Sequence, residues 1–152
     1  MDLILIHGAP VTGKTTVAKA LSRLTALPAV DNILAIDLAR QVFPNGDGGF
    51  WPLVHELRLT TLRAAVRAGM PRLIMTAAYS HPDDLPLYED YERVVQEGGG
   101  RVVPVYLSCS EATLMERVVS EDRRRRGKLS TVERLRGHLA RNSFAALPRE
   151  GC

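Results

Sequence analysis

The chain has 152 residues, 45% of them apolar, which is enough for one domain with a hydrophobic core but too little for two domains of ordinary size. Its net charge of +3 owes much to an arginine cluster at residues 123–126, so nucleic-acid binding through this patch is an open option rather than a requirement. Cys109 and Cys152 form neither a disulfide framework nor a metal-ligand spacing, and no apolar run approaches the ~20 residues of a membrane span. We therefore expect one soluble, cytoplasmic domain over 1–152 without a membrane anchor.

The first half of the chain alternates short apolar runs with helical patterns. Residues 3–7 form an apolar run typical of a buried strand, and a helix is expected from Lys14 onward. A weaker strand is expected over 29–36, which places Asp37 at the N-cap of a short amphipathic helix. The apolar spacing over 51–68 predicts a longer helix.

The second half continues the alternation. Strands are expected over 72–78 and 101–108, separated by a polar helix over 87–97. A helix over 111–121 follows, and a capping-box signal at Ser130 starts a final helix. Strands that alternate with helices imply crossover connections, so the sequence predicts a three-layer α/β domain with a parallel sheet.

The segment GAPVTGKTT matches the pattern G-x-x-x-x-G-K-[ST] between an expected strand and an expected helix. Glycines let the backbone curl so that successive N–H groups point at phosphate oxygens, and the helix start adds its positive end. Lys14 would reach the β- and γ-phosphates, and the Thr15 hydroxyl would bind Mg²⁺. A glycine turn that binds nothing is the alternative. The residues expected around the nucleotide are Gly8, Ala9, Pro10, Val11, Thr12, Gly13, Lys14, Thr15 and Thr16.

Phosphoryl transfer also needs a carboxylate near the acceptor, and Asp37 is the first candidate because it follows the second expected strand. It could act as base or support Mg²⁺, although a plain helix cap explains it equally well. Asp31 is the second candidate. Arg40, one helical turn after Asp37, and Arg58 are candidate acceptor contacts, with a solvated helix face as the alternative.

The segment EDRRRRGK at 121–128 lies between two expected helices, where a run of like charges is costly to bury without anions. We interpret 117–128 as a mobile lid whose arginines close over the triphosphate, and a solvated loop is the alternative. Arg124 is the candidate catalytic arginine and Arg117 a supporting contact to the nucleotide. Which arginine of the cluster acts is left open.

Three segments together resemble the P-loop small-molecule and nucleotide kinases, the group that holds shikimate kinase, gluconate kinase, chloramphenicol phosphotransferase and the nucleoside monophosphate kinases. They are ILIHGAPVTGKTTVAKAL, the D-x-x-R element of Asp37 and Arg40, and VYLSCSEATLMERV before the arginine-rich lid. The resemblance implies a parallel sheet in the order 2-3-1-4-5, Mg·ATP as donor and an acceptor pocket between the Asp37 helix and the helix over 51–68. The end of the chain, LPREGC, has no clear apolar strand, so either the sheet has four strands or the C-terminus is shortened.

The first functional hypothesis is an ATP-dependent (or other NTP-dependent) phosphotransferase with a small-molecule or nucleotide acceptor. One alternative is a slow NTP hydrolase without a dedicated acceptor, because an ill-defined second site would admit water. Another is a nucleotide-dependent binding module whose basic patch engages nucleic acid or a partner. The sequence does not identify the acceptor.

Overall fold

The computed structural model describes residues 1–44, 47–125 and 128–147, the side chains of residues 122 and 125 excepted. Its centre is a parallel sheet of four strands in the order β2-β3-β1-β4. This confirms the expected α/β class and strand order, and among the described residues no fifth strand joins the sheet. The strands are β1 (Asp2–His7), β2 (Ala29–Val30), β3 (Arg72–Ala77) and β4 (Val102–Tyr106).

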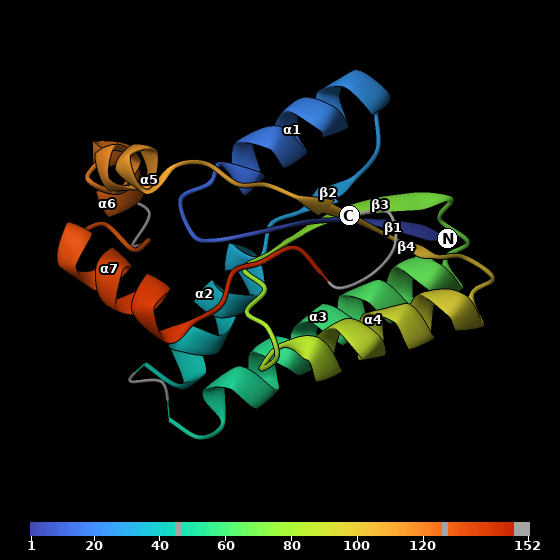
Figure 1. Ribbon diagram of the computed structural model, residues 1–152. Coiled ribbons are helices and arrows are strands. Elements are labelled where there is room, and N and C mark those ends of the chain that lie inside the picture. The colour runs from blue at the N-terminus through green and yellow to red at the C-terminus, as the bar shows by residue number, and fades with distance from the viewer. Residues whose placement is uncertain (45–46, 126–127, 148–152) are drawn as a thin grey trace.

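Helices cover both faces of the sheet, which gives the expected three layers (Figure 1). One face carries α1 (Lys14–Thr25), and the other carries α3 (Phe50–Arg67) and α4 (Leu85–Glu97). Neighbouring side chains of a strand point to opposite faces of the sheet, so the side chains of β1 pack into both helix layers. Leu3 and Leu5 pack into the cluster with α3 and α4, whereas Ile6 packs with Ala18 of α1.

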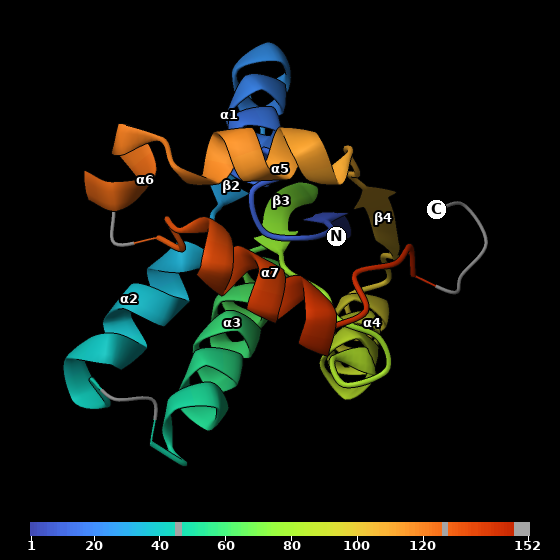
Figure 2. The same cartoon turned by 60° about the vertical axis from the view of Figure 1, so that its left-hand side comes forward.

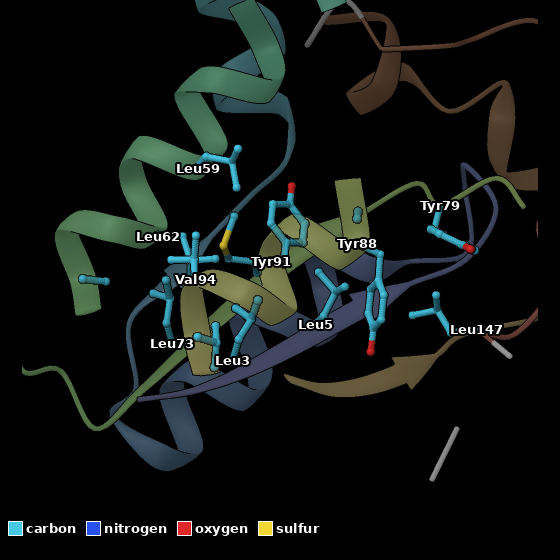
Figure 3. Packing of buried hydrophobic residues seen from close by; sticks show 14 residues of the cluster. Leu3, Leu5, Leu59, Leu62, Leu73, Tyr79, Tyr88, Tyr91, Val94 and Leu147 are labelled. Carbon is cyan, nitrogen blue, oxygen red and sulfur yellow. The ribbon is translucent and has the colours of Figure 1, made fainter. Parts of the chain in front are cut away.

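The larger core lies between the sheet and the α3–α4 layer (Figure 3). Leu62 of α3 and Val95 of α4 are completely buried there, and Tyr88 and Tyr91 fill much of the volume. Full burial of an aliphatic side chain of this size contributes roughly 1.5–3 kcal/mol relative to exposure. This layer therefore holds the sheet against which the loops of the site are built.

The remaining helices gather at the carboxyl ends of the strands (Figures 1 and 2). Parallel strands end at one common edge of a sheet, so this is where an α/β domain collects its loops. The helices at this edge are α2 (Ile33–Val42), α5 (Glu111–Val118), α6 (Glu121–Arg125) and α7 (Val132–Arg141).

The expected strand over 29–36 is wrong in its length. β2 ends at Val30 and α2 already begins at Ile33, so Asp37 lies inside the helix and not at its N-cap. The apolar residues after Val30 follow helical spacing: Ala39 is buried against α3, while the exposed Leu34 makes the segment look uniformly apolar in sequence.

Two further expectations need correction near the C-terminus. Thr131, not Ser130, caps the last helix, because its hydroxyl accepts a hydrogen bond from the backbone N–H of Arg134 at 3.3 Å. The helix expected over 111–121 ends at Val118, and a separate short helix, α6, follows it. The questioned terminal segment LPREGC lies, apart from Leu147, outside the described residues, and Leu147 itself is buried in the main core.

Across the described ranges, the structure contains no helix that is both long enough and apolar enough to cross a lipid bilayer.

Candidate active site

The loop between β1 and α1 is held in a tightly curled conformation. Gly8 and Gly13 have φ angles of 135° and 99°, which side chains rarely tolerate, and Val11 also has a positive φ of 73°. A Cβ atom on Gly8 would in addition overlap the carbonyl oxygen of Leu107, the residue that follows β4 by one position. The glycine in the first position of the motif is thus required by both the backbone angle and the neighbouring chain.

The curled loop opens into a cleft of about 810 Å³ at the carboxyl edge of the sheet. Residues 10–16 line it, together with parts of α1, α2, β3 and the segment from α5 to residue 128. Helix α1 starts at this cleft with Gly13 as its N-cap, and neither a capping side chain nor an acidic residue neutralises its first turn. Its free N–H groups and positive dipole end make the cleft suited to an anion such as phosphate.

Lys14 brings the main positive charge to the loop. Its Nζ donates to the carbonyl oxygens of Gly8 at 2.9 Å and Ala9 at 2.6 Å. Burial, and after it the charge of Arg123, lowers the pKa of Lys14 to about 8. Burial and the neighbouring Lys14 likewise lower the pKa of His7 to about 4, so this imidazole at the end of β1 stays neutral. An anion in the loop would relieve the mutual repulsion of Lys14 and Arg123.

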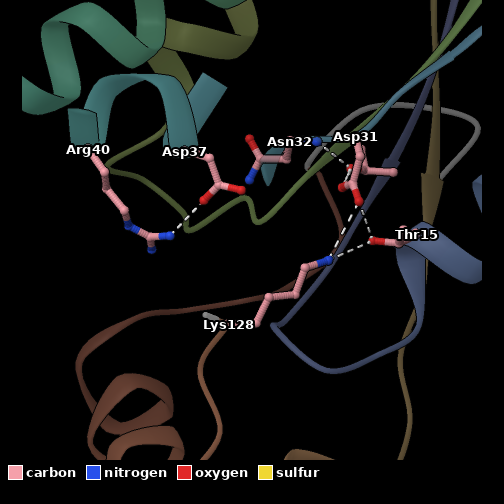
Figure 4. A network of polar contacts seen from close by, with 7 residues as sticks. Thr15, Asp31, Asn32, Asp37, Arg40 and Lys128 are labelled. Carbon is pink, nitrogen blue, oxygen red and sulfur yellow. Dashed lines mark hydrogen bonds and ion pairs between the residues drawn. The ribbon is translucent and has the colours of Figure 1, made fainter. Parts of the chain in front are cut away.

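The carboxylate of the site is Asp31, which directly follows β2. Its Oδ2 accepts a hydrogen bond from the Thr15 hydroxyl, and its Oδ1 accepts one from the Thr76 hydroxyl, both at 2.8 Å (Figure 4). Burial would raise the pKa of Asp31, but these hydrogen bonds and the charge of Lys128 outweigh it, so the pKa lies below its usual value. Asp31 is therefore ionised at neutral pH beside the Thr15 hydroxyl.

This pair offers the oxygen ligands that a magnesium ion prefers, and Mg²⁺ in nucleotide sites commonly takes one or two protein ligands and completes its shell with water and phosphate oxygens. The hydroxyl and the ionised carboxylate fit that role. In the described part of the chain, no group of three or more His, Cys, Asp or Glu side chains forms a separate metal site.

Asp37 and Arg40 lie apart from this centre. The two side chains form an exposed ion pair at 2.8 Å along α2, and neither lines the cleft (Figure 4). Arg58, the other expected acceptor contact, lies between α3 and α4, where it hydrogen-bonds Tyr91 and lies near Asp84. The structure does not bring these three residues to the loop, because the early end of β2 rotates Asp37 away and Arg58 is taken up by the interface of α3 and α4.

The basic segment after α5 does reach the cleft, through other residues than Arg124. The side chains of Arg117, Arg123 and Lys128 line the cleft, whereas Arg124 is exposed and absent from its lining. Arg117 lies 3.5 Å from the carbonyl oxygen of Thr12, and Arg123 donates to the carbonyl oxygen of Leu129 at 2.8 Å. Of the arginine cluster, Arg126 and the side chain of residue 125 lie outside the described residues.

Lys128 completes the polar network. Its Nζ lies 3.4 Å from the Thr15 hydroxyl and 3.6 Å from Asp31 Oδ2, so a lysine from the segment before α7 faces the same two oxygens (Figure 4). Neither Lys128 nor Thr76 stands out in the sequence as a site residue. The position of Thr76 near the carboxyl end of a strand next to β1 is the one signal that could have indicated it.

The sequence matches the profile of an AAA domain family over residues 3–147. The chain belongs to this family. The match spans the loop, the sheet and the basic segment, so it covers every part of the site described above. A comparison with curated proteins gives no significant match.

Solved structures of kinases share the fold. A candidate kinase from Chloroflexus aurantiacus is 20% identical, with a TM-score of 0.73 over 99% of this chain and 81% of its own. A sugar kinase from Janibacter is 20% identical, with a TM-score of 0.64 over 99% and 81% of the two chains. A gluconokinase from Sinorhizobium meliloti is 15% identical, with a TM-score of 0.56 over 91% and 73%. At these identities the likeness establishes a P-loop kinase fold.

Proposed function

We propose that this protein is a phosphotransferase that moves the γ-phosphoryl group of ATP, or of another nucleoside triphosphate, to a hydroxyl group of a small molecule. The observation that carries the proposal is the Asp31 carboxylate, held between the hydroxyls of Thr15 and Thr76 next to a phosphate-type loop. An ionised carboxylate at this place can support Mg²⁺ and can accept the proton of an attacking hydroxyl group, and phosphoryl transfer uses both.

The position of each residue in the cleft suggests its role in the reaction. The loop amides and Lys14 would hold the β- and γ-phosphates, and the Arg117, Arg123 and Lys128 side chains would approach from the opposite side of the cleft. Asp31 would orient the acceptor hydroxyl and receive its proton as the oxygen attacks phosphorus. When bound at Thr15 and Asp31, Mg²⁺ would supply neutralisation of the negative charge on the phosphate oxygens.

The alternative is an NTP hydrolase that uses water in place of an acceptor. The cleft of about 810 Å³ is open enough to admit water, and Asp31 could activate water as well as an alcohol. The same volume accommodates a second substrate, and the fold shared with solved kinases favours the transferase.

The test is turnover of ATP and GTP with Mg²⁺ against a panel of sugars, nucleosides, nucleotides and amino alcohols. We expect one acceptor to accelerate ADP formation and to gain phosphate, and Lys14→Ala to abolish both. Asp31→Asn should lower kcat by about 10²–10⁴-fold, the usual contribution of a general base. Asp37→Asn is the matched control on α2 and should stay near wild type, because its carboxylate lies outside the cleft.

Slow, acceptor-independent ADP formation that still requires Lys14 would replace the transferase with the hydrolase. Equal losses in Asp31→Asn and Asp37→Asn would contradict the assignment of Asp31.

A further inference from the structure

We propose, on the basis of the phosphotransferase function, that the acceptor is an uncharged alcohol with an apolar portion, and that Asn32 and the two isoleucines of α2 recognise it. The inference concerns the wall that α2 and the end of β3 give to the cleft. The residues of this wall are Asp31, Asn32, Ile33, Ile36, Thr76 and Ala78.

This wall carries no lysine or arginine among the described residues that line the cleft. A site for an acid or a phosphorylated substrate needs a cation at its acceptor side, because an anion removed from water without a partner is strongly disfavoured. Here the only charged group that these wall residues supply is the ionised Asp31, and its cationic partner Lys128, at 3.6 Å, belongs to the segment before α7 and not to the wall.

The two arginines that could have supplied such a cation are engaged elsewhere. Arg40 pairs with Asp37 at 2.8 Å on the exposed side of α2. Arg58 hydrogen-bonds Tyr91 between α3 and α4, and neither arginine lines the cleft. The cations that do line it come from the phosphate loop, α1 and the segment over 117–128, and a nucleoside triphosphate would occupy those nearest the loop.

Asn32 provides a polar contact that the protein itself leaves unused. Its side-chain oxygen is buried and lacks a hydrogen-bond partner, although the residue lines the cleft beside Asp31. The side chain does not cap α2. A buried amide oxygen without a partner is unfavourable, and rotation of the terminal amide would let it accept a hydrogen bond from a hydroxyl group of a bound molecule.

Ile33 and Ile36 give the same wall its apolar character. Both are half-buried and line the cleft from the first turn of α2, and Ile36 also packs against the cluster of Ala39, Phe50 and Val54. A polyol that is hydrated on all sides gains little from such contacts, whereas an alcohol with a hydrocarbon portion buries it there. Figure 4 shows Asn32 between Asp31 and Asp37. Because Asp31, Asn32 and the two isoleucines all line the cleft, one acceptor could contact the carboxylate, the amide and the isoleucines together.

The experiment compares matched pairs of molecules that differ in one anionic group: N-acetylserinol with N-acetylserine, adenosine with AMP, and glucitol with gluconate. Binding is measured by ligand-observed NMR on the wild-type protein with Mg²⁺ and the non-hydrolysable analogue AMP-PNP, and phosphoryl transfer is measured separately with ATP. We expect at least one neutral member to bind at least tenfold more tightly than its anionic partner.

Two substitutions make the comparison specific to this wall. Asn32→Leu should weaken binding of the preferred neutral molecule at least fivefold, while Leu34→Ala, on the exposed side of the same helix, should leave it unchanged. Ile33→Arg should shift the preference at least tenfold toward the anionic member, because it adds the cation that the wall lacks.

The outcomes separate this inference from the proposed function. Transfer to an anionic member at equal or higher efficiency would leave the phosphotransferase standing and overturn the neutral acceptor. Binding of a neutral member that depends on Asn32, without any transfer, would support the recognition and remove the proposed reaction. Binding of neither kind of molecule would overturn the inference.

Discussion

Burial and the neighbouring Arg123 disfavour the charged form of Lys14, and its pKa of about 8 is low for a lysine. A phosphate in the loop favours the charged form, so the nucleotide-bound protein holds the proton to higher pH than the free protein. Affinity for ADP without metal should therefore fall as pH rises above about 8, by up to tenfold per pH unit. Titration of a fluorescent ADP analogue between pH 7 and 10 measures this.

The control for that dependence is Lys14→Arg, because a guanidinium does not titrate in this range. Its affinity, whatever its absolute value, should be flat across the same pH interval. A slope equal to that of the wild type would assign the pH dependence to another group.

Gly8 combines a φ of 135° with the close approach of the Leu107 carbonyl. In Gly8→Ala the new methyl group meets both the unfavourable backbone angle and an atom of the adjacent chain, which cannot move independently of β4. We expect a loss of at least about 2 kcal/mol in the free energy of unfolding, measured by urea denaturation, together with loss of nucleotide binding.

Gly48→Ala is the matched substitution, since a Cβ there meets nothing within 4 Å and its backbone angle is ordinary. It should change the free energy of unfolding by no more than a few tenths of a kcal/mol. Equal losses in the two variants would show that Gly8 is not constrained in the way described.

The curled loop between β1 and α1 and its place at the cleft could be predicted from the sequence, because the spacing of the motif is local and its glycines have a steric reason. Asp31 could be named only as a second candidate. Its selection depends on Thr15 and Thr76, which lie 16 and 45 positions away, and on where β2 ends. Such long-range geometry leaves no periodic signal in a single chain.

At the scale of elements, α3 and α4 are joined by polar contacts as well as by their core. Arg58 hydrogen-bonds the buried Tyr91 and lies near Asp84, and His55 lies 3.1 Å from Asp90 across the same interface. Burial raises the pKa of Tyr91 to about 12, with Arg58 acting in the opposite direction, so the phenol stays neutral. The polar side of this interface thus depends on the guanidinium.

Arg58→Met keeps much of the aliphatic stem but removes the guanidinium from this interface. We expect a loss of about 1–3 kcal/mol in the free energy of unfolding, with little change in the KM of any acceptor. Arg63→Met on the same helix is the control, because Arg63 meets Glu56 at 3.6 Å on the surface and such a pair is worth at most about 1 kcal/mol. A large rise in acceptor KM with unchanged stability would restore Arg58 to the acceptor site.

The helix α2 shows why element boundaries were harder to predict than element order. Leu34 and Leu38 are more than half exposed, so the apolar run after β2 does not report burial. As an apolar run, the segment resembles a buried strand. Its helical spacing is seen only in Ile36, Ala39 and Phe43, which pack in one cluster with residues of α3. The expected strand ended a few residues too late, at residue 36. For that reason Asp37, and not Asp31, was the first candidate for the carboxylate of the site.

At the scale of the whole molecule, the alternation of elements predicts a parallel sheet between two helix layers, and the strand order was implied only by the resemblance to P-loop kinases. The way in which the chain after α5 folds around the cleft could not be predicted from the sequence. The segment after α5 folds back over the loop, with Leu135 of α7 completely buried against the cluster that includes Val11 and Leu114. These contacts position Lys128 opposite the phosphate loop.

The ammonium group of Lys128 therefore lies where a divalent ion would bind. It is 3.4 Å from the Thr15 hydroxyl and 3.6 Å from Asp31 Oδ2, the two oxygens that suit such an ion. In the protein without nucleotide, Mg²⁺ or Mn²⁺ has to compete with this charge. Lys128→Ala should bind Mn²⁺ severalfold more tightly, about fivefold if the partly buried ion pair is worth about 1 kcal/mol. Electron paramagnetic resonance of free Mn²⁺ measures the affinity directly.

With nucleotide present the sign should reverse, because the same ammonium group would then face phosphate oxygens, and Lys128→Ala should bind ATP more weakly. Arg67→Ala removes an exposed positive charge from α3, outside the lining of the cleft, and controls for net charge alone. If Arg67→Ala increases Mn²⁺ affinity as much as Lys128→Ala does, general electrostatics explains the gain. If the reversal between metal and nucleotide appears only at Lys128, the segment before α7 holds the metal position in the free protein and changes partner when the nucleotide binds.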